Sequence, residues 1–465
     1  MSLSIGSPGT GPAPPPGSPP GPGRARGSGG RPAKKPSRRT TQVRRNALVM
    51  AWLLIAAVLA ALTIVGPLAS WGTWLPLHAL LLGGIGSAIT IWSAHFADTL
   101  LHRPALGGAA LLDARLYAHS LGTVVVLTGI TMGHQVLALT GAGIVMAQAI
   151  AGVVAITVQY RRAIAPRLAS LAIHYAVALV LLATGALLGF LISWSNARGR
   201  SGLADILYLA HTTTMLLGFV GTTVLGTLTV LWPTMLRTPM EPLAPRWTTR
   251  GLPYLVGGTG LVAASGVWLP LAGLGVLVYL GGACGVLVPA YRTARRVPPT
   301  SFATASATAS VSWFVGCVAV LGARMALADD VGAARDVIHA LRLPLAAGFA
   351  LQILVAALSY LTPVMLGGGP AATRATNTIM DRFAAYRVTA ANACLLLALH
   401  PGAPWQVRVV AGALAALVTS YLLMGMILSL REVSQRKRTP RTPADAAPTS
   451  DPAGRRSAQP RRGTR

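Results

Sequence analysis

The nine histidines are the residues of this chain best suited to chemistry. A neutral imidazole offers a lone pair without adding charge, which suits a metal ion or haem iron in apolar surroundings. His78, His134, His211 and His339 each lie near one end of an apolar run. A polar ring in hydrocarbon is costly without a partner, so such histidines are candidate functional residues. We expect these four to form a shared site, although any one alone could be a hydrogen-bonded packing residue.

A second, looser group consists of His95, His119 and His174, which lie toward the opposite ends of their runs. Their spacing is compatible with a second site or with simple hydrogen bonding between helices. The sequence leaves both interpretations open.

The elements that carry these histidines are membrane helices. Hydrophobic residues make up 53% of the chain and charged residues 11%, more apolar surface than one globular core can bury. About twelve apolar runs approach the roughly 20 residues that a spanning helix needs. They lie near 47–68, 74–101, 116–139, 142–160, 168–194, 205–232, 253–271, 272–291, 302–325, 336–366, 383–399 and 408–430. The sequence therefore predicts an all-α, polytopic bundle.

The positive charge of the chain indicates orientation and not nucleic-acid binding. Arginine and lysine number 39 against 11 acidic residues, and they concentrate in the tails and in alternate loops. Cytoplasmic loops of membrane proteins carry this excess. The basic loops on one side include Arg103, Arg115, Arg161, Arg162, Arg246, Arg250, Arg292, Arg295, Arg296 and Arg382. We predict a multi-pass protein of a bacterial cytoplasmic (inner) membrane with both termini in the cytoplasm.

The chain divides into three regions by composition. Residues 1–45 and 432–465 are basic and rich in Pro, Gly or Ser, and such segments bury too little apolar surface to fold. We expect both to be disordered cytoplasmic tails that flank a transmembrane domain at 46–431. Contact of the tails with anionic lipid is an alternative.

Several kinds of site are excluded or disfavoured by what the sequence lacks. All eleven carboxylates lie at the ends of apolar runs, in loops or in tails, which disfavours a transporter driven by a mid-membrane carboxylate. Cys284, Cys317 and Cys394 form no CxxC pair, so neither a cysteine zinc site nor covalent haem attachment is supported. Walker A, nucleophile-elbow and HExxH motifs are also missing.

The histidine pattern resembles subunit I of the haem-copper oxidase superfamily. That family has twelve helices with both ends inside and ligand histidines in the outer halves of its second, sixth, seventh and tenth helices. The stretches AHTTTMLLGFVGTTVLGTLTVLWPTMLR and GFALQILVAALSYLTPVMLGGGP are also similar to an actinobacterial branch of membrane proteins. Some members of that branch are fused or adjacent to multicopper-oxidase or nitrite-reductase-like modules. The resemblance implies an oxidase-like bundle and a redox partner protein of that kind.

The resemblance also suggests roles for individual residues. His78 matches the second-helix haem ligand, His211 the sixth-helix copper ligand and His339 a tenth-helix haem ligand. The match is degenerate, because 253–271 holds no histidine pair and Leu341 replaces the second histidine of the tenth-helix His-x-His. A complete oxygen-reducing binuclear centre cannot be assembled from these residues.

We therefore expect His78 and His339 to be axial ligands of one b-type haem, and His211 and His134 to form a second, copper-binding or open position. Arg342 follows His339 by three residues and lies on the same helix face, where it could pair with a haem propionate. Snorkelling, or pairing with Asp330 or Asp336, is an equal alternative.

The function expected from these residues is electron transfer, or handling of copper or nitrogen oxides, for a partner redox enzyme. A cofactor-free transporter or permease is the alternative from another class, and an assembly factor for a redox enzyme is a third. The sequence does not decide whether the chain is an enzyme.

Overall fold

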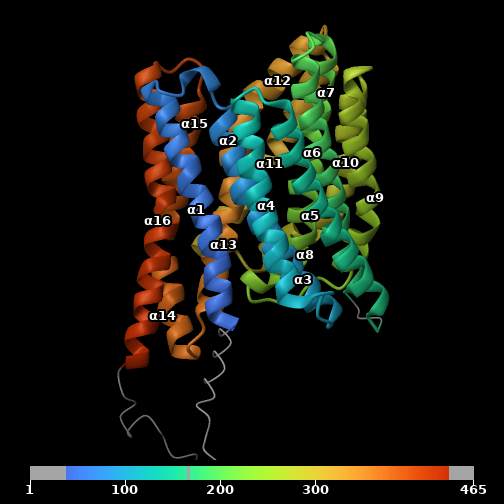
Figure 1. The fold of residues 1–465 in the computed structure, drawn as a ribbon. Coiled ribbons are helices and arrows are strands. Elements are labelled where there is room, and N and C mark those ends of the chain that lie inside the picture. The colour runs from blue at the N-terminus through green and yellow to red at the C-terminus, as the bar shows by residue number, and fades with distance from the viewer. Residues whose placement is uncertain (1–37, 165–167, 439–465) are drawn as a thin grey trace, which may run out of the picture. The chain divides into compact units, whose positions relative to one another are not determined.

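The computed structural model describes residues 38–164 and 168–438, and within these ranges every regular element is a helix. The long helices run side by side along one direction (Figure 1). Ten of them are long and apolar enough to cross a membrane, which confirms the polytopic helical bundle. We call the end at which α1 begins the near end and the opposite end the far end. Of the predicted tails at 1–45 and 432–465, residues 1–37 and 439–465 lie outside the described residues.

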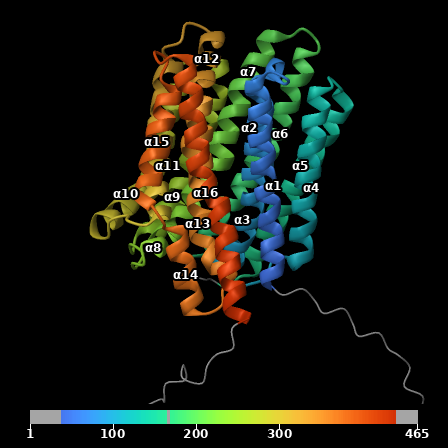
Figure 2. The same cartoon turned by 90° about the vertical axis from the view of Figure 1, so that its left-hand side faces the viewer.

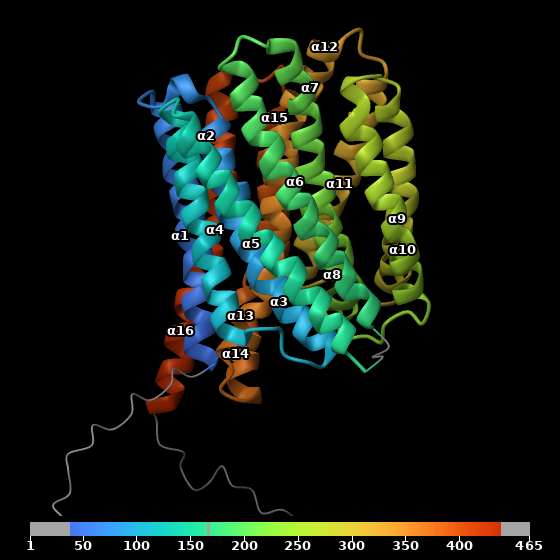
Figure 3. The same ribbon diagram turned by 45° about the vertical axis from the view of Figure 1, so that its right-hand side comes forward.

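Most of the longer helices are regular α-helices. They are α1 (Arg38–Val65), α4 (Gly108–Thr131), α5 (Gln135–Arg162), α6 (Ala172–Asn196), α9 (Ala244–Ala263), α10 (Leu271–Arg296), α11 (Phe302–Ala326), α14 (Pro370–Met380), α15 (Ala384–Leu399) and α16 (Trp405–Arg438). Short 3-10 turns lie at η1 (Ala69–Trp71), η3 (Ala169–Leu171) and η5 (Ala264–Gly266). Helices α1 and α16 border one side of the bundle, and α9 and α10 border another (Figures 1 and 3).

Three spans differ from the others because a π-helical segment interrupts each of them. They are α2–η2–α3 (Trp74–His78, Ala79–Ile85, Gly86–Leu101), α7–η4–α8 (Ser201–Thr213, Thr214–Gly221, Thr222–Met235) and α12–η6–α13 (Val331–Leu343, Pro344–Leu351, Gln352–Leu366). In their most apolar windows 61%, 78% and 67% of residues are buried, against 17–44% in the other seven candidate spans. These three are therefore the central spans of the bundle.

The same packing arrangement recurs around each central span. The helix that precedes the span, α1, α6 or α11, packs against its π segment. The two helices that follow pack against each other as the pairs α4–α5, α9–α10 and α15–α16. The described chain thus consists of three successive units of similar architecture, with α14 added before α15. Figure 2 shows α1 and α16, from the first and last units, on the same face.

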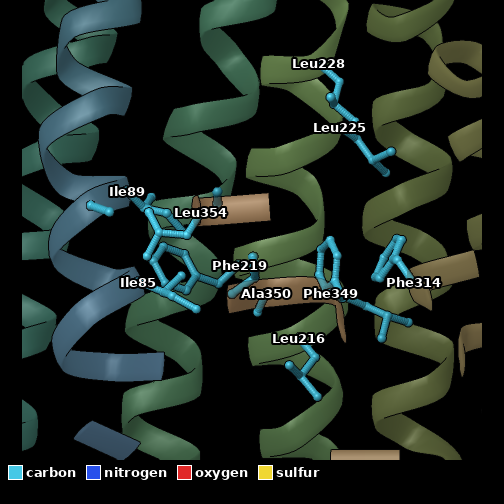
Figure 4. Close-up of a cluster of buried hydrophobic side chains, with 14 of the residues drawn as sticks. Ile85, Ile89, Leu216, Phe219, Leu225, Leu228, Phe314, Phe349, Ala350 and Leu354 are labelled. Atoms are coloured by element: carbon cyan, nitrogen blue, oxygen red, sulfur yellow. The ribbon is translucent and has the colours of Figure 1, made fainter. Parts of the chain in front are cut away.

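The centre of the bundle is an apolar cluster at the level of the π segments. Phe349 of η6 stacks on Phe314 of α11 with centroids 4.2 Å apart, and Phe219 of η4 is fully buried beside them (Figure 4). An apolar cavity of about 100 Å³ continues from this cluster toward the near end, with walls from all three central spans and α11.

Several helix boundaries differ from those predicted. The break after the third span falls at Met132–His134, where Gly133 has φ +66°, and not near residue 140. Helix α4 also begins earlier than predicted, at Gly108, and contains Arg115, which was assigned to a loop. Arg115 is buried and its Nε donates to the Gln148 carbonyl of α5 at 3.0 Å.

The helical region is also longer at both ends than the predicted 46–431. Helix α1 begins at Arg38 and α16 continues to Arg438. Ion pairs support these extensions, since Arg45 binds Asp113 of α4 at 2.7 Å and Arg436 binds Glu432 one turn earlier at 2.6 Å. Two predicted spans are helices that fall outside the ten: α9 starts with an arginine-bearing turn, and α15 has only 16 residues.

Candidate histidine site

His78 and His211 lie together in the far half of the bundle. His78 is the last residue of α2, directly before η2, and His211 lies in the last turn of α7, just before η4. Their ring centroids are 6.3 Å apart and their planes differ by 13°. Both side chains are half-buried. The structure thus brings together two of the four predicted far-end histidines, each contributed by a different central span.

Both rings are fixed through the same nitrogen. The His78 Nδ1 lies 2.8 Å from the carbonyl oxygen of Trp74, and the His211 Nδ1 lies 2.8 Å from that of Gly185 in α6. A carbonyl can only accept, so each Nδ1 carries the proton and each Nε2 carries the lone pair. Metal-ligating histidines are oriented in this way, by donation of the second ring N–H to a backbone carbonyl.

The walls around the pair are aromatic or very small. The Trp74 ring lies 4.5 Å from His78, and Trp71 lies 6.0 Å from Trp74, toward the loop between α1 and α2. A Cβ at Gly189 of α6 would meet the Cε1 of His211 at 3.0 Å. Gly189 therefore leaves the space that the imidazole occupies, and Trp74 packs against His78.

The number of ligands limits what the pair can hold. Among the described residues, no group of three or more His, Cys, Asp or Glu is arranged to hold a metal ion. A bare zinc or copper ion usually takes three or four protein ligands. Haem iron needs only one or two, because the macrocycle supplies the other donors. The two-histidine set therefore fits haem iron better than a bare metal ion.

The ring spacing is also compatible with one shared metal. Metal–imidazole distances of about 2.0–2.1 Å place the centroids of two ligands on opposite sides of a metal about 6 Å apart. The observed separation is 6.3 Å.

His339 lies in a different environment, in α12 between two arginines. The Arg335 Nε lies 3.4 Å from its Nε2, and the Arg342 Nη1 lies 3.3 Å from its Nδ1. The Tyr208 ring of α7 lies 5.3 Å away, and Arg335 also binds Asp205. No ring contact, hydrogen bond or ion pair joins His339 to His78 in the described part of the chain. The structure does not bring these two predicted axial ligands together.

Arg342, predicted to serve an anionic cofactor group, retains unused donor capacity. Its Nε is buried and has no hydrogen-bond partner in the described structure. Neither Asp330 nor Asp336 pairs with it, since Asp330 instead caps α12 by accepting from the Ala333 amide at 2.8 Å. The alternative prediction, that Arg342 pairs with Asp330 or Asp336, is therefore not what the structure shows.

His134 lies in the exposed turn between α4 and α5 and not inside a span. It is the N-cap of α5, where its Nδ1 accepts from the Leu137 amide at 3.3 Å. Capping residues satisfy free amides at a helix start. No recorded contact within 38–164 and 168–438 links His134 to His211, so the structure offers no support for a joint metal site.

The histidines nearer the opposite end do not form a second cluster. His119 is fully buried, with Nε2 2.8 Å from the Leu82 carbonyl and Nδ1 2.9 Å from the Gln148 amide nitrogen. His174 is fully buried against Gly226, whereas His95 is exposed beside Trp92. The sequence left open a second site or hydrogen bonding between helices, and the contacts of His119 are those of hydrogen bonding between helices.

Sequence reasoning missed the feature that organises the site. Each central span carries one far-end histidine followed by a π segment that contains or adjoins glycine: Gly84, Gly218 and Gly348 lie six, seven and nine residues after the three histidines. A further repeat lies at the ends of the second and third central spans, as Pro-Thr-Met-Leu at 233–236 and Pro-Val-Met-Leu at 363–366. Comparison of the chain with itself could have revealed three related units.

No protein-family model matches the chain, and no curated protein matches its sequence.

Proposed function

We propose that this chain is a multi-pass membrane haem protein that transfers electrons, with His78 and His211 as the axial ligands of one b-type haem. The observation that carries the proposal is the pair itself. Two neutral imidazoles from two central spans are near parallel, and both are held at Nδ1 by backbone carbonyls. Among residues 38–164 and 168–438, no third His, Cys, Asp or Glu joins them in a metal-binding group. This is the ligand set that haem iron requires.

When bound, the haem supplies the one-electron redox chemistry. The chain's own residues bind and orient it. The Trp74 and Gly185 carbonyls fix the two ring tautomers, and the resulting hydrogen bonds strengthen the imidazoles as ligands. Trp74 packs against His78, and the buried cluster of Phe219, Phe314 and Phe349 lies at the level of the π segments that follow the pair.

The polar groups around His339 have a separate role in this proposal. Arg342 has an unpaired, buried Nε, and it is the residue that would bind an acidic group of the cofactor. Tyr208, one turn before His211, contacts both His339 and Arg335 and so links this group to the histidine pair. His339 then accepts from one of the two guanidinium groups, as its tautomer allows, and does not bind iron.

The oxidase-like, twelve-helix architecture belongs to this proposal. Helices α9 and α15 added to the ten long spans give twelve, in three units of four. The near-end loops carry the arginine excess, which supports a cytoplasmic near end in a bacterial inner membrane. The far end, with the histidine pair, then faces the side from which a multicopper-oxidase or nitrite-reductase-like partner would exchange electrons. In this proposal the electrons serve the handling of copper or nitrogen oxides by the partner, and the chain itself does not reduce oxygen.

An optical spectrum of the purified chain, with haem quantified as the pyridine haemochrome, tests the proposal. We expect a Soret band in the parent protein that is lost or strongly shifted in His78→Ala and in His211→Ala. His400→Ala is the matched control, because His400 is exposed in the loop after α15.

Each other outcome has a defined meaning. Lack of a Soret band after expression with added haem refutes the haem proposal and leaves the cofactor-free permease or assembly factor. Loss of the band in His339→Ala but not in His211→Ala restores the pairing of His78 with His339. Copper in the parent protein that disappears in His211→Ala would assign His211 to a metal ion instead.

A further inference from the structure

The three π segments have a common position relative to the histidines. Segment η2 directly follows His78, η4 begins three residues after His211, and η6 begins five residues after His339. A π segment contains one residue more than the α-helix it replaces, and such segments occur frequently at functional sites. One added residue turns the helix beyond it by about 100°. The direction in which each histidine points is therefore set by the π segment that follows it.

A π segment leaves a carbonyl to be satisfied from outside the helix, and in η2 this carbonyl belongs to Leu82. The Gly86 amide donates to the carbonyls of Leu81 and Gly83 and bypasses that of Leu82. The Leu82 oxygen instead accepts from the His119 Nε2 of α4 at 2.8 Å. Gly86 is required for this contact, because a Cβ there would lie 2.5 Å from the His119 Nε2.

Segment η4 also receives a side-chain donor, on a carbonyl that additionally accepts from the Thr222 amide. The Tyr279 hydroxyl of α10 donates to the Leu217 carbonyl at 2.9 Å and is fully buried. A Cβ at Gly221 would lie 2.4 Å from that hydroxyl, so this position also requires glycine. In η6 the Ser310 hydroxyl of α11 donates to the Phe349 carbonyl at 2.9 Å.

All three π segments are thus held by a side-chain donor from a neighbouring helix. We propose that His119 and Tyr279 are positioning residues for the histidine pair. They stabilise the π form of η2 and η4 and thereby keep the His78 and His211 rings facing each other. The role of the pair as haem ligands rests on the proposed function. The effect of His119 and Tyr279 on the positions of the two rings does not depend on bound iron.

The physical argument concerns the alternative α-helical form. If His119 is removed, the Leu82 carbonyl is left buried without a partner, and only the α form pairs it within the helix. If the Tyr279 hydroxyl is removed, the Leu217 carbonyl keeps the Thr222 amide and loses the donor that ties η4 to α10. The α form would rotate the far-end part of the span. The hydrogen bond from His211 to the Gly185 carbonyl joins two helices, so it would not survive that rotation. The far-end pair would then separate although neither histidine had been changed.

Thiol cross-linking measures this geometry without any cofactor. His78→Cys and His211→Cys are combined with Cys284→Ser, Cys317→Ala and Cys394→Ala in the full chain. A short bifunctional thiosulfonate reagent is then applied to membranes, and the rate at which the two introduced thiols are joined is followed. We expect rapid cross-linking of the two introduced thiols in the variant that retains His119 and Tyr279.

The Tyr279→Phe variant tests the η4 donor, because it removes one oxygen and retains the ring that packs against Phe314. We expect cross-linking to slow about fivefold or more, the factor that one net hydrogen bond represents. Tyr175→Phe is the matched control: this tyrosine is equally buried, but its hydroxyl pairs with Thr227 and not with a π-segment carbonyl. It should leave the rate unchanged.

His119 is tested by replacement and rescue. We expect His119→Leu to slow cross-linking, and His119→Gln to restore most of the rate because its amide can donate to the Leu82 carbonyl. Rates equal to the parent in both Tyr279→Phe and His119→Leu would overturn the inference, as would equal slowing by Tyr175→Phe. A missing Soret band refutes the haem proposal alone, since the cross-linking result does not depend on haem.

Discussion

The ion pair between α1 and α4 makes a quantitative prediction about the bundle. Arg45 is 6% exposed; its Nε binds the Asp113 Oδ1 at 2.7 Å and its Nη2 donates to the Ala109 carbonyl at 3.1 Å. Arg44 binds the other Asp113 oxygen at 3.1 Å but is 56% exposed. Asp113 is thus the carboxylate that neutralises a nearly buried guanidinium. The perturbation is Asp113→Asn, which keeps an oxygen acceptor and removes the charge.

The magnitude follows from burial. Removal of one partner from a buried pair costs about 3–5 kcal/mol, whereas an exposed pair contributes about 0–1 kcal/mol. The Asp113 side chain is 22% exposed, which places this pair between the two cases. We expect the free energy of unfolding to fall by about 2–4 kcal/mol.

The assay is thermal unfolding of the detergent-purified chain, for which this change corresponds to a decrease in Tm of about 3–6 °C. Glu432→Gln is the control, because its pair with Arg436 is mostly exposed and lies within one helix. That substitution should change Tm by less than about 1 °C, as its pair contributes about 0.3–0.5 kcal/mol. Equal shifts in the two variants would show that Arg45 is solvated and would refute the reasoning.

Two further predictions concern packing and pH. Gly348→Ala should destabilise the chain by about 1–3 kcal/mol, because the new Cβ would lie 2.6 Å from the Trp313 ring. Gly257→Ala, where no atom lies within 4 Å, should be neutral or slightly stabilising in the same unfolding assay, and a reversed order would contradict the packing. At the near end, burial raises the pKa of Asp381, although the hydrogen bond from the Phe302 amide opposes the shift. A raised folded-state pKa means that its stabilising contribution is present at low pH and is lost as pH rises through that pKa. The Tm advantage of Asp381→Asn should therefore grow as pH increases above the ordinary Asp range, and a constant difference would refute this.

The sequence alone was sufficient for the class of fold. Apolar runs of spanning length and arginine-rich loops predict a polytopic helical bundle, because a chain in lipid must satisfy its backbone within helices. Ten helices of the described residues are long and apolar enough to cross a membrane, which confirms that prediction. The boundaries near residues 108–141 were wrong because hydropathy alone does not locate a turn. There the break depends on the left-handed φ of Gly133 and the cap made by His134.

The candidate site was predictable only as a set of residue types. Depth along the predicted spans selected His78, His134, His211 and His339, but depth does not give the rotation of a helix about its axis. That rotation depends on the π segments, and these depend on donors distant in sequence, such as His119 for Leu82 and Tyr279 for Leu217. The sequence therefore determined which histidines could act, and the tertiary structure decided which two meet. Helix rotation is set by contacts between spans and not by the hydropathy of any one span.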